Sequence, residues 1–129
     1  MRLFFGGIAS DPRIEALVNE VIGRVADKWT MIILDVLAEH DVMRFTQLAK
    51  TVSGISQKML TKTLREMERE GLVIRTVYPA VPPKGEYHLT DLGLGLGAAF
   101  CGVWVWAEQS LDTIEQARIT YDERISAEN

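Results

Sequence analysis

The polar side chains best suited to bind a ligand are concentrated between Ser56 and Arg65, in the segment ISQKMLTKTLREMEREG. At helical spacing they form one row of amide, hydroxyl and cationic groups that contains no carboxylate before Glu66. In a DNA major groove, Lys and Arg bind phosphates or guanine, and Gln pairs with adenine. The row consists of Ser56, Gln57, Lys58, Thr61, Lys62 and Arg65. The alternative is that the row is the solvated face of an ordinary amphipathic helix. The neighbouring elements must decide between these two interpretations.

Other kinds of chemistry find little support in the sequence. His40 and His88 are isolated, whereas a metal site needs several convergent donors, so we expect no metal and no cofactor. No nucleophile, base and orienting group converge, which argues against an enzyme. Cys101 is the single cysteine, which excludes an internal disulfide and fits a reducing cytoplasm.

The charge is unevenly distributed along the 129 residues, a length that predicts a single domain. The formal net charge is −4, yet the segment from Arg44 to His88 holds 8 Lys and Arg against 4 Glu. The local field governs where a polyanion binds, so the acidic total does not exclude DNA.

The elements that position the polar row are predicted to be helical. Apolar spacing predicts helices over 11–26 and, capped by Asp27, over 27–40, with Trp29 as a core residue. An extended segment at 42–45 precedes a short helix that we expect Thr46 to cap. Gly54 then allows a tight turn, Ser56 caps the next helix, and Gly71 ends it. Two helices joined by such a turn form a helix-turn-helix.

A β-hairpin is expected after Gly71. Residues 72–78 and 86–89 are rich in β-branched and aromatic side chains, and a proline-rich loop with Lys84 at its tip joins them. A hairpin after a recognition helix is the wing of a winged helix, and its cation suits the minor groove or the DNA backbone. By itself, Lys84 would be an ordinary exposed lysine. The predicted fold class is therefore mainly α with a small β-hairpin.

A long final helix, capped by Thr90-Asp91 and with a break allowed near Ser110, begins with sixteen uncharged residues from Leu92 to Ala107. A helix that is apolar all round must be buried, and a domain this small cannot bury it alone, so we expect a homodimer. This stretch is slightly short for a membrane span. Gly93, Gly95 and Gly97 match a dinucleotide-binding pattern, but no parallel βαβ unit follows, so that interpretation is rejected.

Several segments of the sequence resemble the HxlR-type family of bacterial winged-helix transcriptional regulators, which are relatives of the MarR-like regulators. They include Asp27-Lys28-Trp29-Thr30, Arg44-Phe45-Thr46-Gln47-Leu48, Gly54-Ile55-Ser56-Gln57-Lys58-Met59-Leu60-Thr61, Gly71-Leu72-Val73, Thr76-Val77-Tyr78-Pro79 and Glu86-Tyr87-His88-Leu89-Thr90. Together the matching segments span about two-thirds of the chain.

The resemblance implies a dimeric regulator whose recognition helix enters the major groove of a palindromic operator. The polar row then carries over as the DNA-binding face, with Lys84 as the wing contact and Arg44 and Thr46 as further phosphate candidates. One winged-helix domain would span 1–129, with a DNA-binding core at 27–90 and dimerisation helices at 11–26 and 91–125. A winged helix that serves as a protein-interaction module is the alternative, suggested by the acidic ends of the chain.

The chain departs from the family at one position. Many members carry a cysteine near the start of the first helix, which some use to sense oxidants or electrophiles, and the corresponding place here is near Ala16. We expect Cys101 to be buried and unreactive, because it lies in the most apolar part of the final helix. A small-molecule effector bound between subunits, among Phe100, Trp104 and Trp106, is an alternative use of the aromatic residues, which are more often core.

Overall fold

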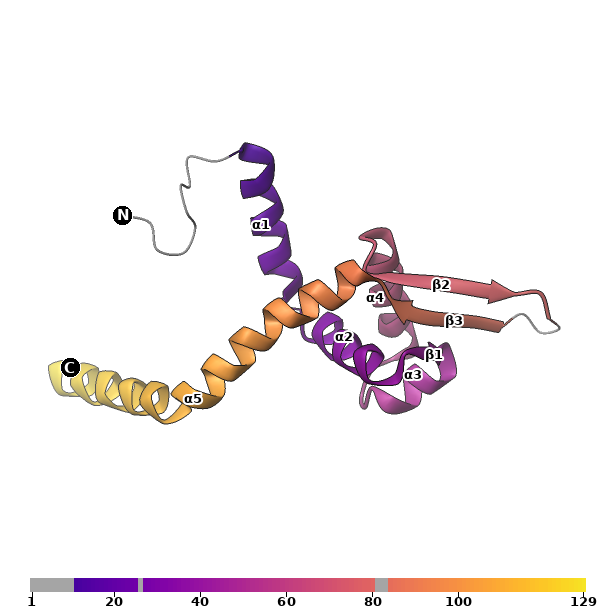
Figure 1. Ribbon diagram of the computed structural model, residues 1–129. Helices are drawn as coiled ribbons and strands as arrows, with labels where there is room; N and C mark the ends of the chain where they lie inside the picture. Colours follow the sequence, from indigo (N-terminus) through magenta and orange to yellow (C-terminus); the bar gives the residue numbers. More distant parts are fainter. Residues whose placement is uncertain (1–10, 26, 81–83) are drawn as a thin grey trace. The chain divides into compact units, whose positions relative to one another are not determined.

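Five helices and three short strands follow one another along the part of the chain that the structure describes (Figure 1). The structure, a computed structural model, describes residues 11–25, 27–80 and 84–129. The elements are α1 (Pro12–Val25), α2 (Lys28–His40), β1 (Val42–Arg44), α3 (Phe45–Thr51), α4 (Gln57–Arg69), β2 (Val73–Tyr78), β3 (Lys84–Leu89) and α5 (Asp91–Glu128). The chain divides into two compact units after Leu94, and the first contains the helix-turn-helix and the sheet. The predicted fold class is confirmed.

The helix ends carry the side chains that the sequence predicts. The Asp27 carboxylate accepts a hydrogen bond of 3.0 Å from the Trp29 N–H, and the Ser56 hydroxyl accepts one of 3.1 Å from the Met59 N–H. Gly54, with φ of 84°, lies in the turn between α3 and α4, and Gly71, with φ of 78°, follows α4. Only glycine adopts these positive φ values at no steric cost, so both turns depend on it.

The start of α3 differs from the prediction. The helix begins at Phe45, with Arg44 in the N-cap position and Thr46 already inside the first turn. The backbone N–H of Arg44 donates a 2.8 Å hydrogen bond to the Gln47 side chain, which closes the helix end without a capping hydroxyl. Expecting Thr46 to be the cap was therefore wrong, because Gln47 satisfies the free donor from inside the helix.

The β-structure is larger than the predicted hairpin. β1 pairs antiparallel with β3, which gives a three-stranded sheet in the order β1-β3-β2. β3 therefore lies in the centre, with Met43 and Arg75 as the partners of Tyr87 on either side. The antiparallel pairing supports rejecting the dinucleotide-binding pattern, which needs parallel strands.

The core of the first unit joins α2, α3, α4 and the sheet. Leu60, Leu64 and Met67 on α4 are buried, as their spacing predicts. The other buried apolar side chains are Ile33, Leu34, Leu37, Met43, Leu48, Val52, Leu72 and Val73. Trp29 is only half-buried, so naming it a core residue was partly wrong, and its neighbour Thr30 is buried instead. The burial of one side of α4 leaves its opposite side for solvent.

Helix α5 runs from Asp91 to Glu128 without the break that the sequence allowed near Ser110. Most of its large apolar side chains are exposed, including Trp104 and Trp106 at 59% each. Cys101 is exposed in the single chain as well, so its expected burial depends on the expected homodimer. No helix in the described part of the chain combines the length and hydropathy needed to cross a membrane.

Gly93 has a packing role that its neighbouring glycines lack. A methyl group at this position would lie 2.3 Å from the backbone oxygen of Leu72, because the start of α5 is tied to that loop. The Thr90 hydroxyl provides the tie, since it donates to the Gly71 oxygen over 2.6 Å and accepts from the Gly93 N–H over 3.1 Å.

We therefore expect Gly93→Ala to lower the free energy of unfolding by about 2 kcal/mol, as overpacking does. Gly23→Ala on α1 is the matched control, because a methyl group there meets nothing within 4 Å and alanine favours helix. Urea denaturation followed by circular dichroism measures both. Equal stability of the two variants would contradict the packing role.

Candidate nucleic-acid interface

The outward side of α4 presents long polar and cationic side chains to solvent. Gln57, Lys58, Lys62 and Arg65 are exposed, and Thr61 is half-buried. The side chains on the opposite side of the same helix, Leu60, Leu64 and Met67, are almost completely buried. Because burial of that side sets the rotation of α4, the cations are held outward. The structure thus brings the predicted polar row onto one exposed surface.

The two hydroxyl groups of the row are engaged within the helix. The Ser56 hydroxyl caps α4 through Met59, and the Thr61 hydroxyl donates a 2.9 Å hydrogen bond to the carbonyl oxygen of Gln57. A capping serine is positioned by the helix end, and a threonine bonded to the preceding turn has a fixed rotamer. The side chains with the longest reach toward a ligand are therefore Gln57, Lys58, Lys62 and Arg65.

Three other predicted contacts lie outside α4. Arg44, at the end of β1, and Thr46, in the first turn of α3, are both exposed. Lys84 begins β3, where its backbone pairs with Tyr78. The side chain of Lys84 and the tip residues 81–83 lie outside the described part of the structure.

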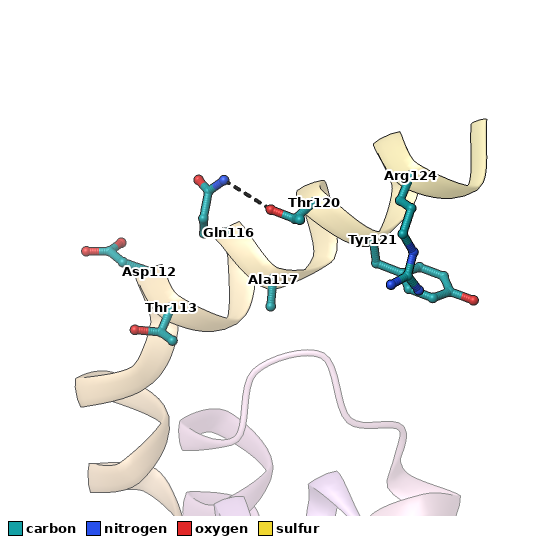
Figure 2. Close-up of a pocket in the computed structure, with 7 residues that line it drawn as sticks. All are labelled: Asp112, Thr113, Gln116, Ala117, Thr120, Tyr121 and Arg124. Atoms are coloured by element: carbon teal, nitrogen blue, oxygen red, sulfur yellow. Dashed lines mark hydrogen bonds between the residues drawn. The ribbon is translucent and has the colours of Figure 1, made fainter. Parts of the chain in front are cut away.

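The structure does not bring the three effector candidates together. Phe100 and Trp104 are four residues apart on α5 and share a side, whereas Trp106, two residues beyond Trp104, lies on the opposite side. A surface pocket on α5 is lined by other residues, as Figure 2 shows: Asp112, Thr113, Gln116, Ala117, Thr120, Tyr121 and Arg124. It is formed by one face of a single helix, so a site containing all three aromatic residues would need a second surface.

One polar cluster next to α4 was missed by the sequence analysis. Arg75 on β2 pairs with Glu68 on α4, with 3.8 Å between the guanidinium Nε and the carboxylate Oε1. Tyr87 on β3 lies opposite Arg75 in the sheet. The sequence contained one signal for this cluster, namely that Arg75 is a single cation in the middle of an otherwise β-branched and aromatic strand. Among the described residues, no group of His, Cys, Asp and Glu side chains is arranged to hold a metal ion.

Comparison with known proteins identifies the family. The model of the HxlR-like helix-turn-helix family matches residues 24–115, which include the helix-turn-helix, the sheet and the first part of α5. The chain belongs to the HxlR-like helix-turn-helix family. This confirms the resemblance found in the sequence.

Relatives of this HxlR-type chain are named as transcriptional regulators. The regulator YtfH of Escherichia coli is 36% identical over 106 residues, which are 82% of this chain and 81% of YtfH. An uncharacterised regulator of Methanothermobacter thermautotrophicus is 44% identical over 80 residues, which are 62% of this chain and only 57% of that protein. The function common to these names is DNA-binding transcription regulation by a helix-turn-helix.

A solved structure supports the same fold. A protein described as a transcriptional regulator of the MarR family, from Enterococcus faecalis V583, superposes with a TM-score of 0.70 at 30% identity. The alignment covers 86% of this chain and 98% of that one. The winged-helix arrangement of this HxlR-type chain is therefore shared with a MarR-type protein.

Proposed function

We propose that this chain is a sequence-specific transcriptional regulator that binds a palindromic operator as a homodimer, with α4 as its recognition helix. The observation that carries the proposal is the exposed cationic side of α4, held outward by its buried apolar side. In this arrangement Gln57 and Arg65 reach base edges, while Lys58, Lys62 and the wing residue Lys84 contact phosphates. Ser56, Thr61, Arg44 and Thr46 complete the contact surface.

The exposed apolar helices support the dimer. Ile14, Leu17 and Ile22 on α1 are each more than half exposed, as are Trp104 and Trp106 on α5. Such side chains lose their contact with water when a second copy covers them. We propose that this dimer, being twofold symmetric, holds two copies of α4 about one helical turn of DNA apart, as two half-sites of a palindrome require.

A transcriptional regulator acts by binding DNA, and this action requires no catalysed reaction. We propose no enzymatic activity, since the relatives are regulators, and we place the protein in the cytoplasm with the DNA that it reads. A small-molecule effector that binds between the two subunits beside Phe100, Trp104 or Trp106 is a further proposal. It requires the second surface that a single α5 does not supply.

Selection of bound fragments from the source genome tests the proposal. Sheared genomic DNA is incubated with the tagged full chain, and the retained fragments are sequenced. We expect enrichment of a few sites that share an inverted repeat with half-sites about 10 base pairs apart. Retention of DNA without any shared sequence would contradict operator recognition, and no retention at physiological salt would favour a protein-interaction module.

A further inference from the structure

Arg75 occupies a position on β2 from which it reaches the recognition helix. Side chains alternate along a strand, so Arg75 lies on the same face of the sheet as the buried Val73, the face that packs against the core. Its guanidinium Nε lies 3.8 Å from Oε1 of Glu68 on α4. The Arg75 side chain is nevertheless 49% exposed, so it lies at the edge of this packed layer and remains in contact with solvent.

A second arginine lies next to this pair. Arg65 precedes Glu68 by three residues on α4, and residues three apart are neighbours on a helix surface. Tyr87 is the cross-strand partner of Arg75, and both Arg75 and Arg65 affect the pKa of its hydroxyl group. Burial raises the pKa of the Tyr87 hydroxyl, Glu68 acts in the same direction, and Arg75 and Arg65 act against it. Arg75 of β2 thus pairs with a carboxylate of α4 that lies one helical turn from Arg65 of the polar row.

An ion pair of this exposure does little for folding. Glu68 retains 43% of its side-chain exposure, and pairs so open to water are strongly screened. The pair does restrain the long side chain of Arg75, so that it lies beside α4 rather than extending freely into solvent. A restrained cation loses less conformational freedom when it binds an anion, and the planar guanidinium suits phosphate oxygens.

We propose that Arg75 is a phosphate-contacting residue of the DNA interface, positioned by Glu68 and Tyr87, and that the interface continues from α4 across β2 toward the wing. This inference rests on the proposed function, because it requires α4 to face DNA. It adds a contact from the strand that separates the two accepted parts of a winged-helix interface, the recognition helix and the loop between β2 and β3. Glu68 is a positioning residue in this arrangement, because it acts through Arg75.

The dependence of DNA affinity on salt tests the contact. The probe is a fluorescein-labelled duplex of about 30 base pairs of mixed sequence, titrated with the full chain at several salt concentrations. Each phosphate that a protein neutralises adds about −0.9 to the slope of log K against log salt. The proposed dimer carries two copies of Arg75 and would lose two phosphate contacts. We therefore expect Arg75→Ala to make the slope shallower by about 1.8, and to weaken binding about thirtyfold near 0.15 M salt. Arg75→Lys should keep the slope, because lysine still neutralises one phosphate.

Arg13→Ala is the matched control. It removes one cation and changes the net charge equally, but it lies on α1, where Arg13 pairs with Asp11 over 2.6 Å. We expect the control to keep the slope of the parent. Should Arg75→Ala fail to fold by circular dichroism, Arg75→Gln replaces it, because glutamine keeps a long polar side chain without the charge.

Two results would overturn the inference. The first is a parental slope in Arg75→Ala. The second is that Arg75→Ala and Glu68→Gln lose the same affinity while both variants keep the salt dependence of the parent. This would mean that the ion pair only holds β2 against α4. Either result leaves the proposed function intact, provided that the double variant with Lys62→Ala and Arg65→Ala still weakens DNA binding. If that double variant binds as the parent does, the proposed DNA-binding face itself is wrong.

Discussion

Replacing Lys62 and Arg65 together with alanine is expected to abolish a gel shift with operator DNA. Each side chain is exposed on the outward side of α4, and a lost phosphate or base contact costs about 1–3 kcal/mol. Since a dimer loses both contacts twice, at least about 4 kcal/mol is lost, and we expect affinity to fall at least about 1000-fold. The buried side of α4 is untouched, so thermal unfolding should remain within a few degrees of the parent.

The control for this variant is Arg118→Ala with Arg124→Ala, which removes the same charge from exposed positions on α5. We expect it to bind DNA much as the parent does, because general electrostatic attraction alone is weaker than local contact. If both double variants lost affinity equally, net charge rather than the α4 surface would govern binding. If neither lost affinity, DNA recognition would lie elsewhere on the chain.

Introducing a carboxylate at Trp104 is expected to break the homodimer. Trp104 is 59% exposed in the single chain, and its indole N–H donates to the Glu108 carboxylate on the same helix. Trp104→Glu therefore costs the folded chain little, whereas tryptophan anchors at interface centres each contribute about 2 kcal/mol or more. Because a twofold interface contains the substitution twice, we expect the dissociation constant to rise roughly 1000-fold.

Light scattering after size-exclusion chromatography measures this effect as a change from the mass of two chains to the mass of one. Gln116→Glu is the control, since it adds the same charge to α5 at a position that is already polar and exposed. The monomeric variant should also lose cooperative binding to an inverted repeat. A parent that elutes with the mass of one chain, or an unchanged Trp104→Glu dimer, would contradict the proposed interface.

Local sequence rules predicted most of the elements because their signals act over a few residues. Asp27 and Ser56 cap helices through hydrogen bonds to residues two and three positions away, and Gly54 adopts a backbone that other residues avoid. The same rules failed at Thr46, where Gln47 closed the helix end from within. They also missed the pairing of β1 with β3, because residues 42–44 and 86–88 are far apart in the sequence.

The candidate site was predictable to the extent that it lies on one helix. Periodicity separates Leu60, Leu64 and Met67 from Lys58, Lys62 and Arg65, since burial of one side of a helix exposes the other. The cluster of Glu68, Arg75 and Tyr87 joins three elements, so no spacing rule could find it. The burial expected for Cys101 stays a prediction, because an apolar stretch indicates burial without showing what covers it, and Cys101 is exposed in the single chain.

The sequence by itself therefore determined the helices, their caps, the turn of the helix-turn-helix and the polar row of α4. These depend on hydrogen bonds and periodicity within about four residues of the chain. Only the tertiary structure decided that a third strand completes the sheet, that Gly93 must lack a side chain beside Leu72, and that Arg75 lies against α4. Contacts between distant segments depend on how whole elements pack, and that packing is set by the complete core.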